Sequence, residues 1–190
     1  MAEQRADQRD DGRTGPPDGA DPQVGEEPQE AARAWEALVA TARRTVVPTS
    51  ELPMHLAVYR HTDARAVVHT HAVHATAVST LVPELPVIHY MTAALGGPVR
   101  VAPYATYGTE ALAENMLRAL DGRSGCLLQN HGTVTYGATL DQAYDRTAQL
   151  EWMCRLWLTA SSVPGLTPSL LSTDQLADVT ERLKGYGQRG

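Results

Sequence analysis

The sequence has little cysteine, no long apolar run and no excess of basic residues, and each absence excludes a class of protein. Its two cysteines, Cys126 and Cys154, stand far apart without a CxxC pair, which indicates neither a disulfide framework nor a cysteine zinc site. No apolar run reaches the roughly 18 residues that a membrane span needs. The polar, acidic start does not resemble a secretory signal. We therefore expect a cytoplasmic protein without a membrane partner.

The charge of the chain is concentrated at its start. Residues 1–30 contain nine acidic residues and three arginines, a net charge of −6 that equals the net charge of all 190 residues. The rest of the chain is neutral and offers no basic surface for nucleic acid. The first 30 residues also have almost no large apolar side chains and cannot bury a core. We predict a disordered acidic tail over residues 1–30 and one domain over residues 31–190.

Helical and extended patterns are interspersed along this domain. Helical spacing and capping signals predict helices at 31–44, 51–60, 109–120, 140–159 and 172–184. Short apolar runs between turn residues predict strands at 66–68, 86–90, 99–102, 125–130 and 133–136. This pattern is typical of a mixed α/β domain.

Histidines are the first candidates for chemistry. His69 and His71 lie two apart at the end of a predicted strand, so their side chains project from the same face. His131 follows another apolar strand and precedes Gly132, where a tight turn can present a side chain to a cleft. Three imidazoles with one open position are typical of a catalytic zinc site. By itself, an HxH pair is also compatible with ordinary surface or core histidines.

The other histidines carry weaker signals. His74 is compatible with a partner that supports a metal ligand or with a surface residue at a helix start. His55 and His61 show no pattern beyond ordinary surface placement, and we interpret them as surface residues.

Five segments occur in an order that is typical of one family. They are 48–59 (PTSELPMHLAVY), 66–78 (AVVHTHAVHATAV), 86–91 (PVIHYM), 102–109 (APYATYGT) and 127–132 (LLQNHG). With a tail around Tyr186, they resemble the class II aldolase and adducin family over about residues 47–187. The resemblance implies an α/β fold of three layers, α/β/α, with a mixed, mostly antiparallel central sheet.

The resemblance also implies a metal and an assembly. His69, His71, His131 and Glu51 would hold Zn²⁺, and Glu51 would also be the general base. A tyrosine, Tyr90, would reach into the site of a neighbouring subunit in a homotetramer and act as the acid.

The resemblance gives two further groups a role at the substrate. Tyr186 would close over the bound sugar phosphate from the C-terminal tail. Thr49 and Ser50 would contact its phosphate group.

The implied reaction is the cleavage of a ketose 1-phosphate, of the L-fuculose 1-phosphate type, into dihydroxyacetone phosphate and an aldehyde. The family also contains pentulose-phosphate epimerases, a dehydratase and the non-catalytic adducin branch.

This chain departs from the family pattern in one region. The Gly-Asn-x-Ser strand and Thr-Pro-Ser-Gly loop that usually bind phosphate are absent before Thr49. We therefore expect a sheet curtailed at its N-terminal strands, and either an altered substrate or a catalytically impaired remnant.

Overall fold

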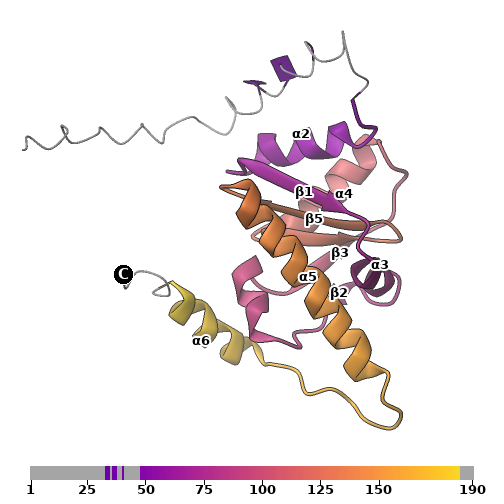
Figure 1. Cartoon of the computed structure of the whole chain (residues 1–190), viewed down its shortest axis with the longest axis vertical. Coiled ribbons are helices and arrows are strands. Elements are labelled where there is room, and N and C mark those ends of the chain that lie inside the picture. Colours follow the sequence, from indigo (N-terminus) through magenta and orange to yellow (C-terminus); the bar gives the residue numbers. More distant parts are fainter. Residues whose placement is uncertain (1–32, 35, 38–39, 41–47, 185–190) are drawn as a thin grey trace, which may run out of the picture.

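A five-stranded sheet is the centre of the fold, which a computed structural model describes at residues 33–34, 36–37, 40 and 48–184 (Figure 1). The strands are β1 (Ala66–Thr70), β2 (Glu84–Leu85), β3 (Val99–Ala102), β4 (Gly125–Leu128) and β5 (Gly132–Gly137). Their order across the sheet is β1-β5-β4-β3-β2. Only β3 and β4 pair in parallel, and the other three pairs are antiparallel. The predicted mixed, mostly antiparallel sheet is confirmed.

Helices cover both faces of this sheet (Figure 1). On one face lie α2 (Leu52–His61) and α4 (Glu110–Leu120), and on the other lie α3 (Val73–Ser79), α5 (Leu140–Ser161) and the 3-10 helix η1 (Tyr90–Leu95). The three-layer α/β/α prediction is therefore confirmed.

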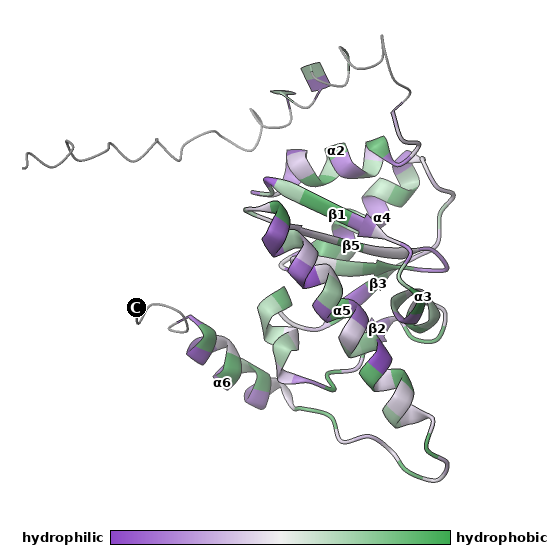
Figure 2. Cartoon of the chain, viewed as in Figure 1, coloured by the Kyte–Doolittle hydropathy of each residue, from purple (hydrophilic) through white to green (hydrophobic). Residues whose placement is uncertain are grey.

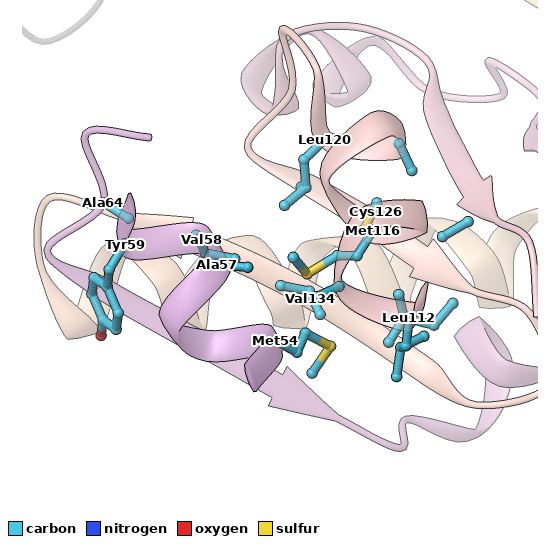
Figure 3. Close-up of a cluster of buried hydrophobic side chains, with 14 residues drawn as sticks. Met54, Ala57, Val58, Tyr59, Ala64, Leu112, Met116, Leu120, Cys126 and Val134 are labelled. Atoms are coloured by element: carbon cyan, nitrogen blue, oxygen red, sulfur yellow. The ribbon is translucent and has the colours of Figure 1, made fainter. Parts of the chain in front are cut away.

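The core has two halves, one on each face of the sheet, because successive side chains of a strand point to opposite faces. On β4, Cys126 and Leu128 face α2 and α4, whereas Leu127 faces α3 and α5, as the two-residue period of a strand requires. Figure 3 shows the first half, in which Met54 of α2 lies among side chains of α4 and the sheet. The two halves hold the helices, and therefore the ends of the strands, in fixed positions.

Most helix boundaries follow from local signals. The side chain of Thr109 accepts a hydrogen bond from the N–H of Leu112 and begins α4. The helix ends before Gly122, whose φ of +65° favours glycine. A capping box of Ser172 and Gln175 begins α6 (Thr173–Leu183). This helix contains both hydrophobic and hydrophilic residues (Figure 2).

A capping box of Thr139 and Gln142 at the start of α5 is only half formed. The hydroxyl of Thr139 accepts from the N–H of Gln142, but the side chain of Gln142 accepts from the N–H of Ala138. The helix α5 therefore begins where predicted, but the side chain of Gln142 bonds to the N–H of Ala138 instead of that of Thr139.

One strand prediction was wrong, and another extended too far. No residue of the strand predicted at 86–90 lies in a strand: β2 ends at Leu85, because Pro86 has no N–H to continue the ladder with β3. The stretch after it instead contacts the C-terminal segment, where the N–H of Leu171 donates to the carbonyl of Val87. The strand predicted at 125–130 ends at Leu128, where a turn begins.

The N-terminal predictions fall mostly outside the described residues. This holds for the tail at 1–30, and the helix predicted at 31–44 is described at five positions, all of them helical. In the described part of the chain no strand precedes α2, and β1 is an edge strand that pairs with β5 alone. None of the described helices is long and apolar enough to cross a membrane.

Candidate metal centre

Strand β1 carries the first two candidate ligands at its end. His69 is the fourth residue of the strand, opposite Val134 of β5, and His71 follows the strand directly. The Nδ1 of His69 lies 2.8 Å from the backbone carbonyl oxygen of Thr133. A carbonyl only accepts, so Nδ1 is the protonated nitrogen and Nε2 keeps a free lone pair. This bond orients the ring as a metal ligand requires.

A tight turn between β4 and β5 presents His131. Asn130, just before it, has φ of +58°, a left-handed conformation that asparagine tolerates. At Gly132 a Cβ would lie 2.1 Å from the carbonyl oxygen of Thr70. Glycine therefore allows the turn to pack against the end of β1, and this close approach brings His131 to the other two histidines.

The three histidines converge on one point. One nitrogen from each of His69, His71 and His131 lies within 4.8 Å of the others. The Nε2 atoms of His69 and His71 are 3.2 Å apart. Two nitrogens bound to one tetrahedral zinc at about 2.05 Å would be roughly 3.3 Å apart. The spacing therefore fits a shared metal ion.

Glu51 completes the arrangement from the start of α2. Its Oε1 lies 3.9 Å from Nε2 of His131, and its side chain is only 12% exposed. Its Oε2 is buried and has no hydrogen-bond partner among the described residues. A buried carboxylate oxygen without a partner is costly unless a cation or another donor satisfies it. Three imidazole nitrogens and one such carboxylate suit Zn²⁺ better than Mg²⁺ or Ca²⁺.

Burial favours the neutral imidazole at His69 and His131. Burial lowers the pKa of His69 to about 4, with smaller contributions from the neighbouring histidines and an opposing one from the Thr133 carbonyl. Burial also lowers the pKa of His131, and the Glu51 carboxylate partly offsets this effect. A neutral imidazole has the lone pair that a metal ligand needs.

The surface interpretation of His55 was wrong. This residue is half-buried, with its ring centroid 6.4 Å from that of His69, and burial lowers its pKa. It lies one helical turn after Glu51 on α2, so the two side chains share a face. That four-residue spacing was the signal in the sequence that could have placed His55 at the site.

His74 is at a helix start, as one of the two interpretations had it, and it has a specific partner. Its Nδ1 lies 2.6 Å from Oε1 of Glu151 on α5. Glu151 was not predicted from the sequence as a residue of this region.

The remaining predicted residues differ in their placement. Thr49 and Ser50 are exposed and directly precede Glu51, and the hydroxyl of Thr49 accepts from the N–H of Glu51 at 3.2 Å. In η1, Tyr90 is 49% exposed and its ring packs against His89 at 4.4 Å between centroids. Among the described residues, no contact joins Tyr90 to His69, His71 or His131. Tyr186 lies outside the described residues.

Comparison with known proteins gives one family. The profile of the class II aldolase and adducin N-terminal domain matches residues 29–158. The chain is 44% identical over 145 residues to the L-fuculose phosphate aldolase of Escherichia coli O6:H1. The matched region covers 75% of this chain and 67% of that protein. It is 35% identical over 143 residues to the 5-deoxy-D-ribulose 1-phosphate aldolase of Bacillus thuringiensis, covering 75% of this chain and 66% of that protein.

A solved structure agrees with these relatives. An L-fuculose 1-phosphate aldolase superposes with a TM-score of 0.68 and 35% identity, covering 73% of this chain and 65% of that chain. The chain thus spans about two thirds of the length of the proteins it matches.

Proposed function

This chain belongs to the class II aldolase and adducin family, and we propose that it is a zinc-dependent aldolase that cleaves a ketose 1-phosphate. The observation that carries the proposal is the convergence of His69, His71 and His131 beside a buried carboxylate, Glu51, with an unpartnered oxygen. This arrangement has the donor set of a catalytic zinc site and a base beside it.

The chemistry requires two kinds of group. A zinc ion bound by the three histidines would supply Lewis-acid stabilisation of the negative charge that develops on the ketone fragment. Glu51 would move the proton at the carbon that was bonded to the aldehyde fragment, since its carboxylate is adjacent to the triad. Thr49 and Ser50 would donate hydroxyl hydrogen bonds to the phosphate group.

The acid for the aldehyde oxygen would come from another subunit. Tyr90 is half-exposed on η1, and its ring packs against that of His89. The ring of His89 in turn packs against that of Trp152 on α5, with 4.8 Å between the ring centroids. An aromatic side chain at such a surface is well suited to an interface. We propose a homotetramer in which Tyr90 reaches a neighbouring triad and Tyr186 closes over the substrate.

The relatives suggest two substrates. Their names include L-fuculose phosphate aldolase and 5-deoxy-D-ribulose 1-phosphate aldolase. Both names describe aldolases of a phosphorylated deoxy ketose, so we propose this class of substrate. A non-catalytic remnant is the rival function, because the expected phosphate-binding segments are absent from the sequence.

The test is a cleavage assay on purified, zinc-analysed protein with L-fuculose 1-phosphate and 5-deoxyribulose 1-phosphate. We expect release of dihydroxyacetone phosphate from at least one of them, and loss of this activity in Glu51→Gln, which keeps the size of the side chain. Bound zinc without cleavage of either sugar would favour the remnant. Cleavage that is unchanged in Glu51→Gln would remove Glu51 from the mechanism.

A further inference from the structure

The helix that follows the HxH pair lacks a capping side chain of its own. Its N-cap residue is Ala72, whose methyl group cannot accept a hydrogen bond. The first N–H groups of a helix have no partner within the helix and need one from elsewhere. In α3 that partner is Glu151 of α5: its Oε1 accepts from the N–H of His74 at 3.0 Å, and its Oε2 accepts from the N–H of Ala75 at 2.8 Å. A carboxylate on a second helix therefore replaces the missing cap.

The same carboxylate also holds a side chain of α3. Its Oε1 lies 2.6 Å from Nδ1 of His74, so three contacts converge on Glu151. The Glu151 side chain is only 27% exposed, and α5 is anchored in the core by Leu150 and Met153 on either side of it. The start of α3 is thus hydrogen-bonded to a helix whose neighbouring residues are buried in the core.

Both segments that carry metal ligands adjoin this first turn. Ala72 alone separates His71 from Val73, the first residue of α3. On the next turn, the hydroxyl of Thr76 lies 2.8 Å from the carbonyl oxygen of Ala72 and 3.3 Å from that of His131. A displacement of the start of α3 would therefore move the backbone at two of the three ligands.

We infer that Glu151 is a positioning residue of the metal centre. By capping α3 it fixes the backbone at His71 and, through Thr76, at His131, although it has no contact with the three imidazoles that the structure shows. The inference rests on the proposed metal centre. Residues that orient metal ligands typically change metal affinity by about 10- to 100-fold when they are replaced.

The experiment measures zinc affinity of the full chain, stripped of metal, by competition with a chromophoric chelator. We expect Glu151→Ala to lower the affinity about 10- to 100-fold. Glu151→Gln keeps one oxygen acceptor and should fall between Glu151→Ala and the wild type. The matched control is Asp145→Ala, which removes an exposed carboxylate from the same helix and should leave the affinity unchanged.

Hydrogen exchange of the metal-free proteins separates capping from positioning. Glu151→Ala should expose the amides of His74 and Ala75 to faster exchange. If it does so while zinc affinity stays at the wild-type value, the carboxylate only caps the helix and the inference is wrong. If Glu151→Ala does not fold, Glu151→Gln decides between the same outcomes. A wild-type chain that binds no zinc would instead refute the metal centre itself, and the inference with it.

Discussion

The Nε2 atoms of His69 and His71 lie 3.2 Å apart, and Nδ1 of His69 is held by the carbonyl of Thr133. The second contact explains the first, because it turns the free lone pair of His69 toward its neighbour rather than toward the sheet. Val134, the partner of His69 across the strands, directly follows Thr133 on β5, so the pairing of β1 with β5 sets this orientation. The candidate metal centre is therefore built on the sheet, with one candidate ligand in the ladder and two in the adjoining turns.

We predict that the triad binds about one zinc ion per chain, and that His71→Ala removes most of it. One of three nitrogen ligands is lost, and the two that remain leave the coordination incomplete. Elemental analysis of proteins purified side by side tests this. His61→Ala, an exposed histidine at the end of α2, is the control and should keep its zinc. Equal zinc in the wild type and His71→Ala would contradict the assignment.

The metal-free protein should lose stability on acidification. The pKa of His69 is about 4 in the folded chain against 6.5 ordinarily. Between these values the unfolded chain binds more protons, so the free energy of unfolding is highest above about pH 6.5 and decreases as the pH falls toward 4. Urea denaturation at pH 7.5, 5.5 and 4.5 measures this slope. His69→Gln should reduce this slope but leave part of it, because the pKa values of His55 and His131 are also lowered. An unchanged slope would show that His69 does not contribute.

The triad was predicted from two local signals together with the resemblance to the class II aldolase and adducin family. An HxH pair at a strand end and a histidine before a turn glycine are patterns of a few residues, and the structure brings them together through the pairing of β1 with β5. Glu151 could not be found in this way. It is 77 residues from His74, and nothing in the pattern of α5 distinguishes it from other polar residues of that helix. The strand predicted at 86–90 failed because apolar β-branched residues were given more weight than Pro86.

Gly132→Ala should weaken both the fold and the metal centre. The new Cβ would lie 2.1 Å from the carbonyl oxygen of Thr70, a backbone atom that cannot move without shifting His71. Overpacking of this kind typically costs about 1–3 kcal/mol and here should also lower zinc affinity. The control is Gly122→Ala, which has open space around its Cβ but a φ of +65° and should cost stability alone. Thermal denaturation and zinc titration of both variants compare the two effects.

A shared active site predicts complementation between inactive subunits. Tyr90→Phe and Glu51→Gln should each lower kcat by about 10²–10⁴-fold as homo-oligomers. If Tyr90 acts across an interface, mixed oligomers should regain activity, with about one site in four carrying both intact groups. The control mixes Tyr90→Phe with Tyr90→Ala, which cannot restore a site. Mixed oligomers without activity, or an active monomer by light scattering, would refute the shared site.

The described residues near Glu51 include few groups that could bind a phosphate. Thr49 and Ser50 are exposed, and each has a single hydroxyl hydrogen to donate to a phosphate. A cavity of about 270 Å³ beside them is lined by side chains without a positive charge at neutral pH: Thr49, Leu52, His55, Leu56, Tyr59 and Val67. A neighbouring cavity includes Arg60, but its guanidinium pairs with Glu36.

We therefore predict little preference for L-fuculose 1-phosphate over free L-fuculose, measured as the ratio of their kcat/KM values. A phosphate is usually held by several charge-assisted hydrogen bonds of about 1.5–3 kcal/mol each, so losing two costs at least about 10²-fold. That binding energy also orients the reacting carbon, which lowers kcat as well. Insertion of Gly-Asn-x-Ser and Thr-Pro-Ser-Gly segments before Val47 should restore the preference. Strong selectivity in the unaltered chain would mean that another group binds the phosphate. Arg60→Ala would then identify its source, because selectivity that disappears in this variant belongs to Arg60, and selectivity that persists lies elsewhere in the chain.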